Sequence, residues 1–535
     1  MSALTTPMML LLTVVLVAAQ GDLTSAVVEG TVKNLKTGEA IADVRVSLTP
    51  DPTAGISPNP GIVTKSGATD ANGKFTITGV APGRYAVAAT RTLFFRPRRD
   101  TGPTVLTLTA GQRISGVQIL LSPTGVVAGR VIDDKREPLR SVRVEAVRRE
   151  FREGQRVWVS SATSTTDDRG EYRLFNLAPG NYYVRATQGN SPPLYYPGSP
   201  DSQAAVSVSV EQGSDAGGID VEMRRMPEYS VQLKLGGVPA GSQANFQIRR
   251  KNGLANELQL GRPENLANDT YRLGQLTPGS YDIQVQVYTP GGIQPRALTH
   301  AATIPVNVGN ANQDLGTVAV PATVSVTGRI RVPDPLPSPL ALERLTLFLR
   351  SLDLPLNPAG SVRGNTTPPG FAPDGSFTLS GLAAGRYQIQ LTGLPADTFV
   401  ISARERTREV LDTGFTVTGT QNALELTVGG PGSVGTVIGT VVNALGNPLT
   451  SSTVVLVPPP ERRSNPAAFR TATTDQSGAF SIRSVLAGDY RILAWEDLEA
   501  GAYMDPEFLK DFETRGELLR VQRGSQSNVV VRGMP

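Results

Sequence analysis

Residues 69–90 have the sequence TDANGKFTITGVAPGRYAVAAT, and this stretch decides the fold. After the polar start at Asp70, the apolar residues Phe75 and Ile77 alternate with polar ones. Beyond the A-P-G segment, Tyr85 and Val87 continue an alternation of period two. That period predicts β-strands with one buried face, and the Pro-Gly pair predicts a turn between them. The stretch therefore predicts a turn, a strand, a corner and a second strand.

The same plan recurs along the chain. Further copies are TDDRGEYRLFNLAPGNYYVRA (166–186), NDTYRLGQLTPGSYDIQVQ (268–286), APDGSFTLSGLAAGRYQIQL (372–391) and TDQSGAFSIRSVLAGDYRILA (474–494). The copy at 268–286 lacks the D-x-x-G segment. The corner glycines lie 97, 99, 106 and 103 residues apart, at Gly83, Gly180, Gly279, Gly385 and Gly488. A repeat of this length is that of a whole small domain rather than of a solenoid unit.

Two further markers keep the same period. A strand with a central glycine opens four of the units, as in VEGTVKN (28–34), and a hairpin pattern such as LTAGQRISGVQILL closes each of the five. The three markers together predict five domains, with limits 24–123, 124–226, 227–322, 323–431 and 432–535. Alternating strands in units of about 100 residues are typical of sandwiches. The predicted fold class is all-β, a tandem array of five antiparallel, Ig-like β-sandwich domains.

Domains 3, 4 and 5 depart from the plan. Domain 3 is degenerate, and domain 4 carries Pro-rich insertions such as PDPLPSPL that we interpret as loops. Domain 5 inserts DPEFLKDFETRG, in which Asp505 suits a helix N-cap and Pro506 the first helical position. A short helical insertion is therefore predicted in domain 5.

The composition excludes several kinds of site. The chain of 535 residues has no cysteine and a single histidine, His300. Disulfides, thiolate metal sites, cysteine nucleophiles and two-histidine zinc sites cannot form within it. The net charge of +4 gives no indication of nucleic-acid binding. We predict that the protein is not an enzyme and carries no metal or cofactor; carboxylate-only hydrolysis would need two acids to converge in a cleft.

The N-terminal residues resemble a secretory signal. Met8–Ala19 is a mostly apolar run too short to span a bilayer, and it ends in small residues suited to cleavage. No lysine or arginine precedes Lys33, which departs from the usual pattern. We predict a signal peptide at residues 1–19 and a secreted, periplasmic or cell-surface protein. No later segment is long and apolar enough to cross a membrane.

The D-x-x-G segment has two interpretations. Asp with Asn72 and a glycine resembles the start of a calcium loop, but no bidentate acid follows and Lys74 takes a ligand position. Alternatively, the aspartate caps a type I turn and the glycine supplies a positive φ. We favour the turn at the four pairs Asp70 and Gly73, Asp167 and Gly170, Asp374 and Gly375, and Asp475 and Gly478.

A tyrosine follows every corner glycine by two positions. In sandwiches, a tyrosine at such a corner often bonds to the backbone a few residues upstream. A structural role as tyrosine corners is predicted for Tyr85, Tyr182, Tyr281, Tyr387 and Tyr490.

The order G-x-V, TD-x-x-G-x-F and L-x-P-G-x-Y resembles the carboxypeptidase regulatory-like domain and its transthyretin-like (prealbumin-like), Cna B-type and starch-binding-like relatives. The resemblance covers nearly all of the chain after residue 23 and is weakest in domain 3. It implies a sandwich fold and says little about function. The peptidase domain that accompanies the founders needs histidine ligands that this chain lacks.

Exposed aromatic residues are the candidate ligand site. Sugar rings stack on flat aromatic side chains, as the starch-binding-like resemblance implies, and the candidates are Trp158, Tyr195, Tyr196 and Trp495. The alternative is that the two tryptophans lie in cores. Arginines mixed with aromatics at 91–100 and 148–158 either bind a polyanion or lie over apolar surface.

The sequence favours an exported, non-enzymatic scaffold, adhesion or protein-interaction protein at the cell envelope. Its partner would be a protein or a polysaccharide, and no nucleic acid is expected. Carbohydrate binding through the exposed aromatics is the alternative function.

Overall fold

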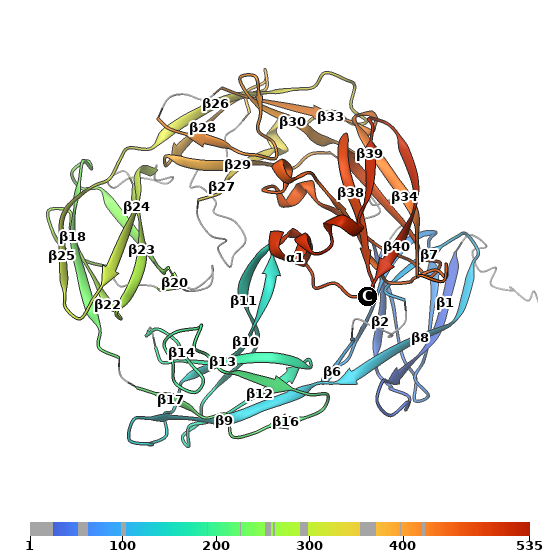
Figure 1. Ribbon diagram of the computed structural model, residues 1–535, viewed down its shortest axis with the longest axis horizontal. Coiled ribbons are helices and arrows are strands. Elements are labelled where there is room, and N and C mark those ends of the chain that lie inside the picture. The colour runs from blue at the N-terminus through green and yellow to red at the C-terminus, as the bar shows by residue number, and fades with distance from the viewer. Residues whose placement is uncertain are drawn as a thin grey trace, which may run out of the picture.

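The computed structural model is almost entirely β and forms five sandwiches in chain order (Figure 1). The predicted fold class is confirmed. The structure describes residues 25–51, 63–97, 103–189, 191–224, 226–251, 258–259, 263–288, 298–353, 371–395, 397–419 and 423–535. The predicted signal peptide at 1–19 lies outside these ranges, as does part of the Pro-rich insertions of domain 4.

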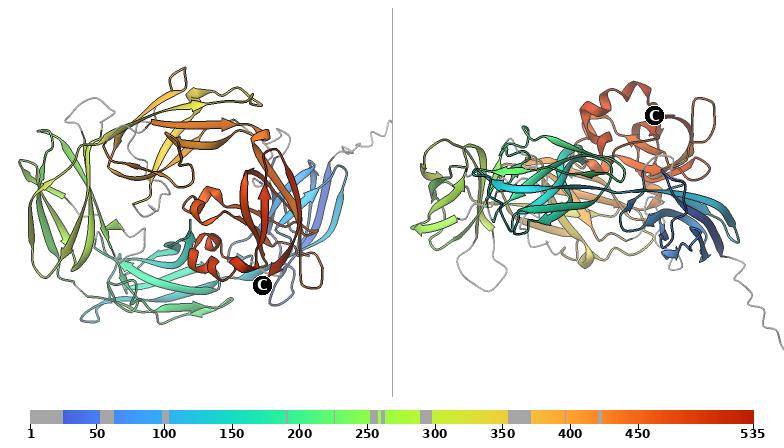
Figure 2. Two further views of the ribbon diagram at one scale, coloured as in Figure 1. Left: turned by 45° about the horizontal axis from the view of Figure 1, so that its top comes forward. Right: turned by 90° about the horizontal axis from the view of Figure 1, so that it is seen from below.

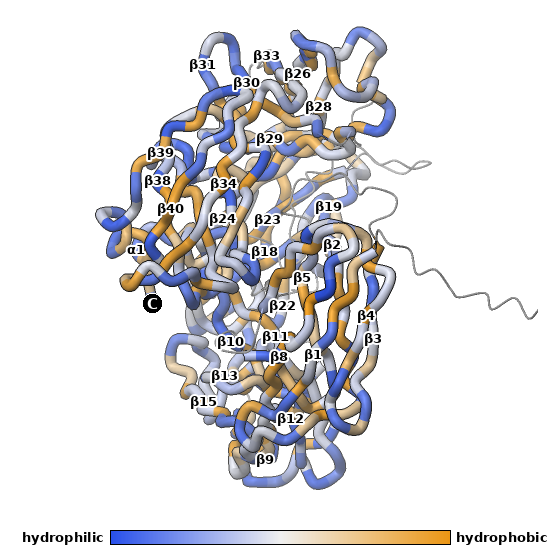
Figure 3. Tube along the Cα trace, turned by 90° about the vertical axis from the view of Figure 1, so that its right-hand side faces the viewer, coloured by the Kyte–Doolittle hydropathy of each residue, from blue (hydrophilic) through white to orange (hydrophobic). Residues whose placement is uncertain are grey.

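Domain 1 packs the sheet β4-β1-β8-β6 against the sheet β3-β2-β5-β7. Its strands are β1 (Ala26–Asn34), β2 (Arg45–Pro50), β3 (Lys65–Ala68), β4 (Lys74–Val80), β5 (Gly83–Thr90), β6 (Phe94–Phe95), β7 (Val105–Leu108) and β8 (Arg113–Pro123). The alternation predicted from residues 69–90 appears as buried Phe75, Ile77, Tyr85 and Val87 in one core. Hydrophobic and hydrophilic residues accordingly alternate along the strands (Figure 3).

Domain 2 packs β12-β9-β16, with β17 also on β9, against β11-β10-β13-β14, with β15 also on β13. Its strands are β9 (Gly125–Asp133), β10 (Arg143–Arg152), β11 (Gln155–Thr165), β12 (Glu171–Leu177), β13 (Gly180–Thr187), β14 (Leu194–Tyr195), β15 (Ser207–Val210), β16 (Asp215–Ala216) and β17 (Val221–Met223). The hairpin of β10 and β11 is paired from residue 143 to residue 165 and extends beyond the sandwich toward domain 5 (Figure 1).

Domain 3 packs β21-β22-β18-β25 against β20-β19-β23-β24. Its strands are β18 (Tyr229–Gly236), β19 (Gln243–Arg250), β20 (Leu258–Gln259), β21 (Pro263–Ala267), β22 (Thr270–Leu276), β23 (Gly279–Tyr288), β24 (Leu298–Val308) and β25 (Gln313–Ala319). Although its sequence is degenerate, it keeps a core of its own.

Domain 4 packs β28-β26-β33-β30-β31 against β27-β29-β32. Its elements are β26 (Val324–Arg331), the 3₁₀ turn η2 (Leu342–Arg344), β27 (Thr346–Ser351), β28 (Ser376–Leu382), β29 (Gly385–Thr392), β30 (Phe399–Glu405), β31 (Arg408–Glu409), β32 (Phe415–Val417) and β33 (Ala423–Gly429). The segment PDPLPSPL contains neither helix nor strand, as predicted for a loop.

In domain 5 the strand order is β36-β35-β38-β40-β34-β37, with β39 also on β38, because β38 and β40 join the two layers at one edge. Its strands are β34 (Val434–Val442), β35 (Thr453–Val457), β36 (Arg470–Thr473), β37 (Ala479–Leu486), β38 (Gly488–Trp495), β39 (Glu517–Val521) and β40 (Gln526–Met534). Its helical elements are η3 (Pro431–Ser433), η4 (Pro460–Arg462), η5 (Pro466–Ala468), η6 (Ala502–Met504), α1 (Pro506–Lys510) and η7 (Glu513–Arg515). The predicted helix is α1, and the Asp505 side chain caps it by accepting from the Glu507 amide at 3.0 Å.

The sheets depart from the predicted antiparallel pattern in one respect. In each domain the first strand pairs in parallel with the closing segment, as β1 does with β8 and β34 with β40. The opening-strand glycine allows this approach, since a Cβ on Gly30 would lie 2.1 Å from the Val117 carbonyl oxygen. Sequence alternation is the same for both strand directions, so it could not distinguish them.

The five domains form a closed ring rather than an extended string (Figure 1). The last domain, domain 5, contacts the first, domain 1. Seen edge on, domain 5 is stacked above domain 1 (Figure 2). The sheet with β19, β23 and β24 is on the side of domain 3 toward the ring centre (Figure 1). Among the described residues, no helix is long and apolar enough to cross a membrane.

Candidate functional site

The D-x-x-G aspartates cap turns. In domain 1, Asp70 Oδ1 accepts from the amides of Asn72 at 2.9 Å and Lys74 at 2.8 Å. The glycine at the end of the turn, Gly73, has a φ of +70°. Asp167 Oδ1 accepts in the same way from the amides two and four residues on, and Gly170 has a φ of +71°. These are the contacts expected of a turn rather than of an open ligand shell.

Domain 5 shares this geometry, because Asp475 Oδ1 also accepts from the Ala479 amide at 3.0 Å. In domain 4, Ala372 takes the first position of the turn, its carbonyl accepts from the Gly375 amide, and Asp374 lies within the turn. Asp374 Oδ1 accepts from the Ser376 amide at 3.0 Å, and Asp475 Oδ1 accepts from the Ser477 amide at 2.9 Å. Positive φ values of +80° and +75° occur at Gly375 and Gly478. In the part of the chain that the structure describes, no three acidic or histidine side chains gather as a metal-ligand set.

The five repeated tyrosines each donate a hydrogen bond to the carbonyl four residues upstream. The acceptors are Ala81 for Tyr85 (2.8 Å), Ala178 for Tyr182 (2.7 Å), Thr277 for Tyr281 (2.8 Å), Ala383 for Tyr387 (3.0 Å) and Leu486 for Tyr490 (2.9 Å). The corner glycines Gly83, Gly180, Gly279, Gly385 and Gly488 have φ between +146° and +157°. Burial raises the pKa of Tyr387 to about 12, so this hydroxyl remains a donor at neutral pH.

The aromatic residues expected to stack on sugars are not exposed together. Trp158 and Trp495 are 3% and 1% exposed, and Tyr195 is 1% exposed. Trp158 stacks on Tyr195 with ring centroids 5.8 Å apart, whereas Trp495 lies in a separate cluster of domain 5. Tyr196 is half-buried against the core of domain 2. The expectation of exposed tryptophans is wrong, because a loop in domain 2 and the helical insertion in domain 5 cover these sheet faces.

The domain 5 copy of the repeated turn also contacts domain 1, through the second carboxylate oxygen of Asp475. Asp475 Oδ2 accepts from Thr107 Oγ1 at 2.6 Å and lies 3.8 Å from the guanidinium of Arg84. Arg84 also pairs with Asp51 at 2.8 Å, and the side chains of this triad are at most 9% exposed. Gln476 exchanges two hydrogen bonds with the backbone of Thr107, at 3.0 and 2.9 Å. Asp475 therefore caps its own turn and closes the ring.

The pKa of Asp475 is lowered in this arrangement. Burial acts to raise it, but hydrogen bonds from the Thr107 hydroxyl and from Ser477 and Ala479 lower it by more. The carboxylate is thus held in its charged form at the junction.

The β10–β11 hairpin joins domain 2 to domain 5. Phe151 lies near its tip and is 8% exposed, within a cluster that includes Trp495 and Leu509. The contact is close: a Cβ on Gly154 would lie 2.6 Å from the Met504 carbonyl oxygen. Near the tip, Glu153 also pairs with Arg350 of domain 4. We call this Phe151 contact the cross-brace.

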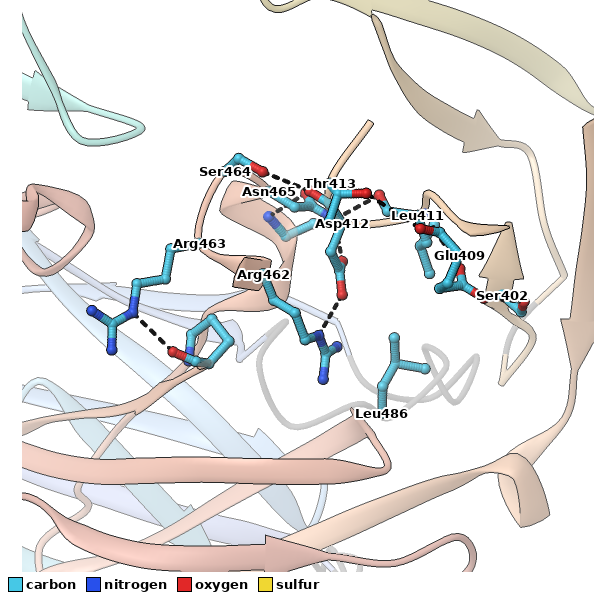
Figure 4. A network of polar contacts seen from close by, with 12 residues as sticks. Ser402, Glu409, Leu411, Asp412, Thr413, Arg462, Arg463, Ser464, Asn465 and Leu486 are labelled. Atoms are coloured by element: carbon cyan, nitrogen blue, oxygen red, sulfur yellow. Dashed lines mark hydrogen bonds and ion pairs between the residues drawn. The ribbon is translucent and has the colours of Figure 1, made fainter. Parts of the chain in front are cut away.

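A polar network joins domains 4 and 5 (Figure 4). Asp412 accepts from Arg462 Nε at 2.5 Å and from Asn465 Nδ2 at 2.7 Å, and its carbonyl accepts from Ser464 Oγ at 2.8 Å. Asp412 is itself buried, so its charge is compensated by the arginine and the amide. Domain 5 is consequently held by domains 1, 2 and 4.

A cleft of about 800 Å³ lies where domains 1, 2 and 5 meet. Both arginine-rich segments, 91–100 and 148–158, contribute to its walls. Their arginines serve packing: Arg149 lies 5.1 Å over the Trp158 ring, Arg148 pairs with Glu150, and Arg96 donates to two backbone carbonyls. Burial lowers the pKa of Arg96 to about 10. Of the described arginines, Arg91, Arg149 and Arg156 lie over aromatic rings, which agrees with the second of the two interpretations. Arg98 and Arg99 lie outside the described residues.

Sequence reasoning missed the junction residues Thr107, Gln476 and Asp412, and it assigned Phe151 to an arginine-rich surface instead of to a junction. The first three are polar or charged residues of ordinary appearance, and nothing in the spacing indicated which distant domain they meet. Phe151 and Trp158 are the two aromatic residues of the segment RREFREGQRVW, and aromatic residues among charges were the available signal.

The family model of the carboxypeptidase regulatory-like domain matches residues 27–122 and 126–224. Domains 1 and 2 are thus two tandem carboxypeptidase regulatory-like domains. A search of the curated proteins found no match.

Several solved pilin structures show low similarity. The minor pilin GBS52 of Streptococcus agalactiae is 16% identical, with 38% of this chain and 97% of that chain covered and a TM-score of 0.24. A streptococcal ancillary pilin is 14% identical, with 55% and 98% covered and a TM-score of 0.21. BcpA, the major pilin subunit of Bacillus cereus, is 11% identical, with 76% and 99% covered and a TM-score of 0.15. Scores below 0.5 give no basis for assigning the role of a pilin to this chain.

Proposed function

We propose that this protein is an exported, non-enzymatic scaffold that presents its domains as one braced ring for adhesion or protein interaction at the cell envelope. The observation that carries the proposal is the closure of the ring by domain 5. Polar contacts join it to domains 1 and 4, and the buried Phe151 joins it to domain 2.

Closure distinguishes this scaffold from a chain of independent beads. In a flexible string, linkers set the reach of each domain and weak sites act through effective concentration. In a braced ring, the relative positions of the sites are fixed, so less conformational entropy is lost when several sites engage one partner. Fixed spacing therefore favours a partner with repeated or extended features, such as an envelope protein or a polysaccharide.

The contacts of the repeated polar residues, in the part of the chain that the structure describes, support a binding role. The repeated polar residues that resemble a site cap turns or close the junction, and the repeated tyrosines bond to the backbone. Carbohydrate binding through Trp158, Tyr195, Tyr196 and Trp495 loses its basis because both tryptophans and Tyr195 are buried.

Ring closure and binding can be tested in one protein. The chain has no cysteine, so Thr37→Cys in domain 1 and Leu445→Cys in domain 5 provide two unique spin-label sites at exposed turns. We expect one narrow distance distribution for the otherwise native protein. Disrupting the junction by Thr107→Val together with Gln476→Ala should broaden it.

Binding is tested by applying residues 20–535 to immobilised cell envelopes and measuring how much protein is retained. The same junction variant is measured alongside the native protein for comparison. The proposal predicts retention of the native protein and weaker retention of the junction variant. A broad distance distribution in the native protein, or equal retention of both forms, would contradict the braced-ring scaffold.

A further inference from the structure

In each domain, we call the sheet that contains the strand of the repeated tyrosine (β5, β13, β23, β29 or β38) the second sheet. One face of this sheet packs on the core, and the other faces outward. In four of the domains, residues of another domain or of a covering segment contact this outward face. In domain 1 this face carries Arg84 and Thr107, which meet domain 5. In domain 2 it carries Trp158, which Tyr195 covers. In domain 5 it carries Trp495, which the helical insertion and Phe151 cover.

Domain 4 follows the same rule. On its second sheet, Arg350 of β27 pairs with Glu153 of the cross-brace, and Gln388 of β29 faces the carbonyls of Leu411 and Asp412. In domain 3 the corresponding outward face belongs to β19, β23 and β24.

That face differs in its chemistry. The residues of β19, β23 and β24 that alternate with the core are uncharged and polar or small across the middle of the sheet, and we call them the amide face: Gln243, Asn245, Gln247, Gln284, Gln286, Tyr288, Ala301 and Thr303. Strand register places them in rows, with Asn245 beside Gln286 and Gln247 beside Gln284. Gln243, Asn245 and Thr303 are exposed. The sheet that carries the amide face lies on the side of domain 3 toward the ring centre (Figure 1).

The charges of this sheet stay at one end. Arg249 is paired in register with Asp282, and Lys251 lies 3.4 Å from the same carboxylate. A nucleic acid or an acidic polymer needs cations along its path, and the amide face has none. A protein interface has an apolar, often aromatic centre, whereas the aromatic residue of the amide face, Tyr288, lies at the end of the β19–β23 pairing.

Carboxamides and hydroxyls suit a ligand rich in neutral hydroxyl groups. Each carboxamide offers both donors and acceptors, so rows of them can bind hydroxyls that themselves donate and accept. Adjacent strands present these groups about 4.8 Å apart, which makes a regular grid across the sheet. Within the described part of the chain, the buried Gln284 Nε2 lacks a hydrogen-bond partner, and a ligand oxygen would satisfy it after a small shift.

We propose that the amide face of domain 3 binds a neutral polysaccharide. The site does not involve the buried tryptophans or the contacts that close the ring. A failed glycan test would therefore leave the proposed scaffold function unaffected. The full chain would hold the glycan on the inner side of the ring.

The test is isothermal titration of the full chain with neutral hexasaccharides of glucose in α-1,4, β-1,4 and β-1,3 linkage. Heparin and polygalacturonate provide the polyanionic arms. We expect at least one neutral hexasaccharide to bind and neither polyanion to bind. The double substitution Asn245→Ala with Gln286→Ala should weaken that affinity roughly tenfold, because two hydrogen-bonding groups are lost.

Gln390→Ala is the matched control, since Gln390 is exposed on the second sheet of domain 4. It should leave the affinity unchanged. Thr303→Ala, a milder change on the amide face, is the second variant should the double substitution lower the melting temperature. Binding of polyanions alone, no binding of the neutral hexasaccharides at roughly millimolar concentration, or affinity unchanged in both amide-face variants would overturn the proposal.

Discussion

Domains 3 and 5 share one sandwich plan and are held in the ring in different ways. Domain 5 is fixed by a buried aromatic side chain from domain 2, a carboxylate network with domain 4 and an ion-pair triad with domain 1. Domain 3 meets domain 4 where the amide and hydroxyl of Thr323 donate to the Thr299 carbonyl at 2.7 and 3.1 Å, and it meets domain 2 where the Arg250 guanidinium donates to the Pro200 carbonyl at 3.4 Å. The difference teaches that a repeated fold supplies the cores, and that side chains outside the repeated motif decide how the domains are placed.

The largest expected effect comes from removing the cross-brace. Phe151→Ala takes a buried ring out of the domain 5 cluster, and loss of a buried phenylalanine costs about 3 kcal/mol of unfolding free energy. We expect a loss of this size for the unfolding step of domain 5, measured by chemical denaturation. Phe175→Ala is the control, since Phe175 is 57% exposed in the same domain as Phe151 and should have a small effect. Equal effects of the two changes would show that the hairpin does not brace domain 5.

The next effect is the pH dependence of the junction between domains 1 and 5. The pKa of Asp475 is lowered in the closed ring, so its contribution is complete above the ordinary aspartate value of about 3.9. It is lost as the pH falls through the lowered pKa, because the protonated carboxyl group accepts the hydrogen bond from the Thr107 hydroxyl more weakly. Spin-label distances between domains 1 and 5 should therefore broaden as the pH falls below about 4.

Asp475→Asn keeps an amide oxygen for the turn and removes the charge. It should weaken closure at neutral pH by about 1 kcal/mol and reduce the pH response. Asp70→Asn changes the same turn in domain 1, away from the junction, and should leave the distances unchanged. A native protein whose distances stay narrow from pH 7 to pH 3 would show that Asp475 does not control closure.

An effect of similar size, but confined to one domain, is expected in domain 3. Tyr281→Phe removes the hydroxyl that donates to the Thr277 carbonyl and should destabilise this domain by about 1 kcal/mol. Hydrogen exchange of β23 reports the change, while amides at the junctions of domain 5 should exchange at the native rate. Faster exchange at those junctions would show that the two halves of the ring are coupled.

The smallest expected effect is that of calcium. Because the D-x-x-G aspartates already accept backbone amides, added calcium should leave the melting temperature unchanged. A rise of several degrees in a calorimetric scan would contradict the turn interpretation of Asp70.

The features predictable from sequence are those that depend on neighbouring residues. The alternation in KFTITGV makes Phe75 and Ile77 face one core, and the Asp70 cap spans only four residues. The Thr107–Asp475 bond joins residues 368 positions apart, and no period in the chain encodes that distance. Trp158 and Trp495 misled for a related reason: strand alternation places them outward, and non-periodic segments then cover them. The rows of the amide face likewise required the register between strands.

The parallel pairing of opening and closing strands has a mechanical consequence. In each domain, the chain enters along one strand and leaves along a neighbour that points the same way, as β34 and β40 do. A pull on the two ends of such a domain slides these strands past each other, so their hydrogen bonds are loaded together in shear instead of being peeled apart singly. If the two ends of the chain are pulled apart, the contacts that close the ring at domain 5 give way first. The sandwiches themselves then bear the tension.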